Sequence, residues 1–84
     1  MRIKMENLKV KIDEIYIPIT FKNPKKKKLQ ERIAFYEKNA EYKVPIVVTE
    51  NNKGYELIDG YTSYLVAKFY GYSKVEVIVK EVED

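Results

Sequence analysis

The sequence predicts one small α+β domain, residues 1–84, with the element order β-α-β-β-α-β. Apolar and polar residues alternate near both ends of the chain, which is the period of a half-buried strand. Two internal segments instead repeat apolar residues every three to four positions, the period of a helical face. A chain of 84 residues has room for one modest core, so we expect a single domain.

The first strand is predicted by Leu8, Val10 and Ile12, which alternate with lysines in the pattern of a half-buried strand. A short extended segment, residues 15–17, follows after two acidic residues break the alternation. Residues 19–23 lie between two prolines and are expected to form a loop.

The first helix is predicted by an apolar stripe that consists of Leu29, Ile33, Tyr36 and Ala40. Asn23 and Pro24 would suit the N-cap and the first helical position, which would place the lysine run 25–28 in the first turn. Lysines near a helix N-terminus oppose the helix dipole. We therefore expect the helix to begin nearer Leu29 and to end at about Asn39.

Two short apolar runs, residues 46–48 and 55–58, flank the sequence NNKG at residues 51–54. The first run is rich in β-branched residues and has the length of a buried strand, and the tetrapeptide has the composition of a turn. The two runs are therefore expected to pair as a β-hairpin.

The second helix is predicted to begin after Gly60, because apolar residues then recur every four positions. Its expected apolar face consists of Tyr61, Leu65 and Phe69. Gly71 suits the left-handed position that follows a helix C-terminus. Alternating valines in residues 75–79 predict the last strand, before an acidic tail at residues 81–84.

Cysteine and histidine are both absent from the chain. Disulfide bonds, thiolate chemistry, the usual zinc sites and Ser-His or Cys-His nucleophiles are therefore excluded. The apolar runs are far shorter than the ~20 residues of a membrane-spanning helix, and charges interrupt the N-terminus where a signal peptide would be apolar. These features predict a cytoplasmic protein with no membrane segment.

The formal net charge of +3 is distributed unevenly along the chain. Residues 1–43 hold 12 Lys or Arg against 6 Asp or Glu, whereas residues 44–84 hold 4 against 7. Much of the positive charge lies at Lys22 and in the run 25–28, which could attract a nucleic acid or a nucleotide. The alternative is a solvated lysine-rich loop that only favours solubility.

Residues 55–68 place a short strand, a glycine turn and a helix start in succession. The first amides of a helix have no internal partners and carry the positive end of the helix dipole, so a phosphate could bind there. The expected phosphate-binding residues are Gly60, Tyr61, Thr62 and Ser63. The alternative is that Asp59 is an ordinary N-cap and that the two hydroxyl residues are simply polar side chains of an exposed first turn.

The segments PIVV at 45–48, YELIDGY at 55–61 and VEVIV at 75–79, with a helix ending at Gly71, resemble the ParB N-terminal and sulfiredoxin superfamily. The likeness spans about residues 10–79. It implies a mixed sheet packed against two helices. It also implies a phosphate-holding helix start, as in partition proteins that bind and hydrolyse CTP, in nucleases, in a serine kinase branch and in sulfiredoxin.

The turn departs from the motifs that it resembles. Partition proteins carry Gly-Glu-Arg-Arg and sulfiredoxin carries Gly-Cys-His-Arg, whereas this chain has a tyrosine and two hydroxyl residues after Gly60. Tyr61 therefore stands at the nucleophile position of sulfiredoxin, which argues against that activity. Loss of an arginine removes a charge-assisted bond of roughly 1.5–3 kcal/mol, so CTP hydrolysis is not expected.

Positive charge for a phosphate would then come from outside the turn. The resemblance places the loop before the first helix beside the nucleotide pocket, where the family often has Asn-Pro followed by basic residues. Asn23-Pro24-Lys25-Lys26 is similar to that pattern. The expected charge donors are Lys25, Lys26, Lys27 and Lys28, with Arg32 and Lys68 as further candidates.

The first expected function is a module that binds nucleic acid or a nucleotide, with ATP or CTP and Mg²⁺ as the candidate ligands. The first alternative is a nuclease or a phosphotransferase in which Asp59, Glu56 or Glu14 would hold magnesium. The second alternative is a protein-interaction module that has lost the ligand and uses its tyrosines to hold a partner.

Overall fold

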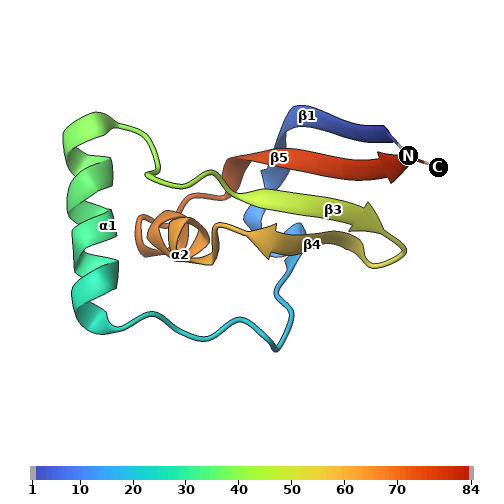
Figure 1. The fold of residues 1–84 in the computed structure, drawn as a ribbon. Helices are drawn as coiled ribbons and strands as arrows, with labels where there is room; N and C mark the ends of the chain where they lie inside the picture. Colours follow the sequence, from blue (N-terminus) through green and yellow to red (C-terminus); the bar gives the residue numbers. More distant parts are fainter. Residues whose placement is uncertain (1, 84) are drawn as a thin grey trace.

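The structure, a computed structural model, describes residues 2–83 and contains one five-stranded sheet and two α-helices (Figure 1). The strands are β1 (Arg2–Lys11), β2 (Ile15–Tyr16), β3 (Val47–Asn51), β4 (Gly54–Asp59) and β5 (Lys74–Glu83). The helices are α1 (Lys26–Asn39) and α2 (Tyr61–Phe69), and a 3-10 turn (Ile12–Glu14) joins β1 to β2. The predicted α+β class and element order are confirmed. Within the described residues, neither helix has the length and apolarity needed to span a membrane.

The sheet is mixed and has the strand order β1-β5-β3-β4-β2. The predicted hairpin of β3 and β4 is antiparallel, as is the pair of β1 and β5, whereas β3 with β5 and β2 with β4 are parallel. β1 and β5 are longer than the alternating segments predicted, because backbone pairing continues where burial does not. Ile3 and Met5 of β1, for example, remain 57% and 60% exposed. Asp84, the end of the predicted acidic tail, lies outside the described residues.

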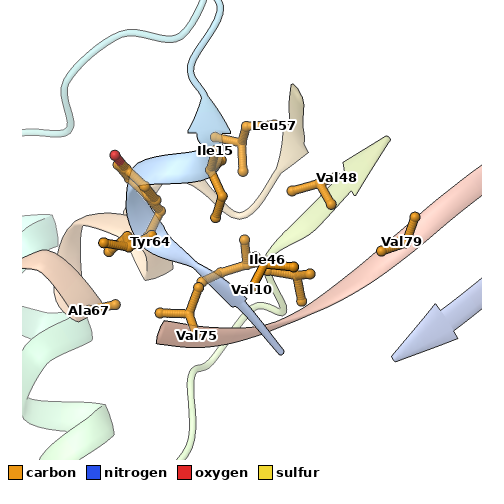
Figure 2. Close-up of a cluster of buried hydrophobic side chains, with 11 residues drawn as sticks. Val10, Ile15, Ile46, Val48, Leu57, Tyr64, Ala67, Val75 and Val79 are labelled. Carbon is orange, nitrogen blue, oxygen red and sulfur yellow. The ribbon is translucent and has the colours of Figure 1, made fainter. Parts of the chain in front are cut away.

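The core lies between the sheet and α2, and Figure 2 shows Tyr64 and Ala67 of this helix beside side chains from the strands. The side chains of Ile46, Val48 and Leu57 are almost inaccessible to water. Complete burial of an aliphatic side chain of this size stabilises a fold by about 1.5–3 kcal/mol. Apolar burial therefore fixes the position of α2 on the sheet.

The buried face of α2 differs from the predicted one. The buried side chains are Ser63, Tyr64, Val66 and Ala67. Phe69 of the predicted face is 64% exposed, and the other two residues of that face are only half-buried. The small side chains of Ser63 and Ala67, four residues apart, let the helix backbone lie close to the rest of the fold, so the larger residues of the predicted stripe fall at its margin.

α1 begins at Lys26, earlier than the predicted start near Leu29, although its C-terminal end agrees with the prediction. Lys25 is the N-cap residue, so Asn23 and Pro24 precede the helix and do not cap it. An exposed charge at a helix end costs only about 0.3–1 kcal/mol. Packing of α1 against α2 outweighs this cost, and the lysines remain in the first turn.

The turn between β4 and α2 depends on Gly60. Its φ of +83° lies in the left-handed region, and a Cβ atom at this position would lie 2.2 Å from the carbonyl oxygen of Pro45 and 2.8 Å from Cα of Ile46. Only a residue without a side chain fits this approach. Gly60 is also the N-cap of α2, so the expectation that Asp59 caps the helix is wrong.

Gly60→Ala is expected to lower the free energy of unfolding by about 2–5 kcal/mol, because left-handed strain of about 1–2 kcal/mol adds to overpacking of about 1–3 kcal/mol. Gly71→Ala is the matched control, since Gly71 has φ +73° but a Cβ there meets nothing within 4 Å. In this control the free energy of unfolding should fall only by the amount of the left-handed strain, about 1–2 kcal/mol. Urea denaturation measures both variants, and equal losses would contradict the importance of the Pro45 contact.

Candidate functional site

A pocket of about 340 Å³ lies where the loop of residues 17–25 meets α1 and the N-terminus of α2. It is lined by Phe21, Lys22, Pro24, Lys28, Arg32, Val44, Asp59, Gly60, Tyr61, Thr62 and Ser63. α2 lies between α1 and the sheet, which brings the two helices together (Figure 1). The pocket thus joins the glycine turn to the basic segment, two features that are far apart in the sequence.

The first turn of α2 has the chemistry of an anion site. The first helical hydrogen bond runs from the N–H of Tyr64 to the carbonyl oxygen of Gly60, at 3.0 Å. The N–H groups of residues 61–63 therefore precede the helical ladder, and no acidic residue occupies this turn. Asp59 interacts with the turn only through Oδ1, which accepts the N–H of Gly60 at 2.8 Å.

The two hydroxyl residues of this turn are not equivalent. Ser63 is 2% exposed, and its hydroxyl donates to the carbonyl oxygen of Val44. Its side chain therefore ties α2 to the segment before β3, while its backbone N–H remains at the helix start. Thr62 is half-buried and lines the pocket. No sequence pattern distinguished the two residues, because the wrong face of α2 was predicted to be buried.

Three cationic side chains line the pocket, namely those of Lys22, Lys28 and Arg32. Lys28 and Arg32 lie four residues apart in α1 and so share one face of the helix. The neighbouring lysines of the run, residues 25–27, do not line the pocket. Lys68 does not line it either, because its Nζ lies over the ring of Tyr64, 5.5 Å from the ring centroid.

Sequence reasoning did not name Phe21, and it named Lys22 only as part of the positive charge of the N-terminal half. Both come from the loop before α1, and Phe21 packs against Tyr61 with ring centroids 5.6 Å apart. Lys28 and Arg32 were both among the expected charge donors. Their spacing of four residues was the signal that could have separated them from the other lysines of the run.

The carboxylates considered for a magnesium site do not come together. Glu56 accepts a hydrogen bond from Asn51 Nδ2 at 3.4 Å in the β3–β4 hairpin, and Glu14 belongs to the 3-10 turn. Only Asp59 lines the pocket. Within residues 2–83 there is no group of three or more Asp, Glu, His or Cys side chains that could hold a metal ion.

A larger cavity of about 750 Å³ has a wall of tyrosines near the C-terminal end of α1. Tyr36 is central, because its ring stacks on Tyr42 with centroids 4.9 Å apart and its hydroxyl bonds that of Tyr72 at 3.0 Å. Tyr70 packs on the same ring and donates its hydroxyl to Glu37 at 2.9 Å. The four tyrosines, Tyr36, Tyr42, Tyr70 and Tyr72, form an aromatic surface, the tyrosine cluster, outside the pocket at the Gly60 turn.

Comparison with known proteins supports the fold through structure alone. No protein-family model matches the chain, and no curated protein matches its sequence. The C-terminally truncated partitioning protein ParB from Caulobacter crescentus, complexed with CTP-gamma-S, matches with a TM-score of 0.72 and 15% identity. A Pnob8-like ParB N-domain matches with a TM-score of 0.76 and 19% identity. Sulfiredoxin from Arabidopsis thaliana matches with a TM-score of 0.74 and 19% identity.

These matches cover 94%, 99% and 92% of this chain, respectively. They span only 46% and 32% of the two ParB chains, but 86% of sulfiredoxin. The predicted resemblance and fold are therefore confirmed: the chain has the ParB/sulfiredoxin-like fold.

The tyrosine cluster predicts a dependence of stability on alkaline pH. Burial raises the pKa of Tyr42 to about 12, with smaller contributions from Tyr36, Tyr72 and Glu76. An unfolded tyrosine ionises near pH 10. Between about pH 10 and 12 the unfolded chain releases a proton that native Tyr42 retains, so the free energy of unfolding should fall as the pH rises.

Urea denaturation between pH 9 and 11.5 measures this fall. Tyr42→Phe removes the ionisable group but keeps the ring, and it should make the dependence on pH shallower. An identical slope for the wild-type protein and the variant would contradict the assignment to Tyr42.

Proposed function

We propose that this domain binds the phosphate groups of a nucleotide in the pocket between the loop of residues 17–25, α1 and α2. The observation that carries the proposal is the convergence of Lys22, Lys28 and Arg32 on the pocket that contains the Gly60 turn. The pocket lining contains three cationic side chains and only one acidic side chain, that of Asp59. The N–H groups of residues 61–63, at the start of α2, add to the positive potential. This combination favours a multiply charged anion.

The distribution of charge fits a phosphate chain. Arg32 can offer a planar, bidentate grip on phosphate, and Lys22 and Lys28 add point charges from a loop and a helix. Relatives with the motifs described above carry arginine in the turn itself, whereas here the cations come from other elements. Thr62 and the backbone N–H groups of residues 61–63 would contribute neutral hydrogen bonds.

A nucleotide is favoured over duplex nucleic acid by the size of the pocket. About 340 Å³ lies at the lower end of the range for small-ligand sites. The ParB from Caulobacter crescentus that shares the fold was solved with CTP-gamma-S, a nucleotide. Nucleic acid is the second candidate, because exposed Lys25, Lys26 and Lys27 start α1 outside the pocket. Binding without catalysis is proposed, since Asp59 already holds the turn.

The test is an NMR and calorimetric titration with CTP, ATP and a short DNA duplex, with and without Mg²⁺. Lys28→Gln with Arg32→Gln should weaken nucleotide binding by roughly ten- to a hundredfold or more, the effect of losing one or more charge-assisted bonds. The matched control, Lys26→Gln with Lys27→Gln, removes the same charge from outside the pocket. It should change nucleotide affinity by less than about threefold, the effect expected of exposed charges.

Two outcomes would oppose the nucleotide proposal. One is the absence of any shift at residues 60–64 with CTP or ATP. The other is an equal loss in the two double variants together with a steep dependence on salt, which would indicate surface binding of a polyanion such as DNA.

The two hydroxyl residues of the turn give a separate prediction. Ser63→Ala should lower the free energy of unfolding by about 0.5–1.5 kcal/mol, because the part-buried carbonyl oxygen of Val44 loses its donor, and should leave nucleotide affinity nearly unchanged. Thr62→Ala should change the free energy of unfolding by no more than about 0.5 kcal/mol, but should reduce nucleotide affinity roughly two- to tenfold. Affinity loss in the Ser63 variant alone would show that the roles are assigned the wrong way round.

A further inference from the structure

Tyr61 connects the two sides of the pocket. Its hydroxyl donates to Asn23 Oδ1 at 2.8 Å, 38 residues away in the sequence. Its ring lies between those of Phe21 and Tyr64, with centroid distances of 5.6 and 6.1 Å. A tyrosine on α2 thus holds the loop of residues 17–25 by one polar and one aromatic contact.

The loop has little regular structure, although Ile17 and Phe21 also pack against the core. It carries Phe21, Lys22 and Pro24 to the pocket, yet it contains no helix or strand after β2. Within the loop, the N–H of Phe21 donates to the carbonyl oxygen of Pro18 at 3.1 Å, which folds the loop on itself but does not attach it to α2. Among the described residues, the side-chain hydrogen bond that joins this loop to α2 is the one between Tyr61 and Asn23.

We propose that Tyr61 is a positioning residue whose hydroxyl fixes the loop of residues 17–25 against α2 and thereby preorganises Lys22 at the pocket. Its hydroxyl proton is donated to Asn23, so the side chain acts through the loop and not as a ligand of phosphate. A loop that is already ordered loses less conformational freedom when a ligand binds, which raises affinity. This inference rests on the proposed phosphate site, but it also makes a prediction for the protein without ligand.

The test is Tyr61→Phe, which removes the hydroxyl and keeps the ring between Phe21 and Tyr64. In the free protein, amides of residues 19–23 should exchange with solvent faster than in the wild type. Affinity for CTP or ATP should fall roughly two- to tenfold, the effect of losing one neutral hydrogen bond. Asn23→Ala should give the same two effects, and the double variant should lose no more affinity than either single variant.

The matched control is Tyr72→Phe. It also removes one tyrosine hydroxyl from a side-chain hydrogen bond, that with Tyr36 at 3.0 Å, but it lies in the tyrosine cluster and outside the pocket. The exchange of residues 19–23 and the nucleotide affinity should both remain those of the wild type.

The outcomes separate this inference from the proposed function. If the wild-type protein binds neither nucleotide, the proposed function fails, while faster loop exchange in Tyr61→Phe still supports the link to the loop. If the wild type binds and Tyr61→Phe behaves as the control does, the inference is overturned. Weaker binding with unchanged loop exchange would also overturn it, because the hydroxyl would then contact the ligand directly. Asn23 is exposed, so Asn23→Ala decides the matter even if the Tyr61 variant folds poorly.

Discussion

The close approach of the Gly60 turn to the backbone of Pro45 determines where the N-terminus of α2 lies. The absence of a side chain lets the turn lie against the residues just before β3, and the buried hydroxyl of Ser63 reinforces this contact at Val44. Because α1 packs on α2, the same contact also sets the position of the cationic helix. The glycine is therefore explained by the fold itself and is not, on its own, a sign of ligand binding.

The stronger sign of a ligand is the arrangement of charge around that turn. Four consecutive lysines precede and begin α1, but the phase of the helix brings only Lys28 to the pocket and adds Arg32 one turn later. Lys22 arrives from the loop on the other side. In the site proposed above, these two elements take the place of the arginines that the partition-protein and sulfiredoxin motifs carry in the turn itself. A comparison of the turn sequences alone would not find them.

Local patterns were enough to predict the hairpin, the two helices and the last strand, because periodicity and turn residues report directly on these elements. They failed where tertiary contacts decide. The spacing of Tyr61 and Phe69 indicated a buried stripe, yet the small side chains of Ser63 and Ala67 face the core. The dipole argument against a helix start at Lys26 was correct in sign but smaller than the packing of α1. The expected charge donors show the same limit: Lys28 and Arg32 line the pocket at the turn, whereas the other four expected donors do not.

The contact between Tyr61 and Asn23 illustrates this limit best. Asn23 before Pro24 has the local sequence of a helix cap, and a cap would have used its side chain within the same segment. The side chain instead accepts a hydrogen bond from across the pocket, and α1 starts later with Lys25 at its N-cap. In the proposed site, one of the three cations, Lys22, is carried by an irregular loop, and ordering this loop beforehand lowers the conformational cost of binding. A tyrosine suits that role, because its ring is rigid and its hydroxyl reaches a partner that a shorter residue at the same position would not.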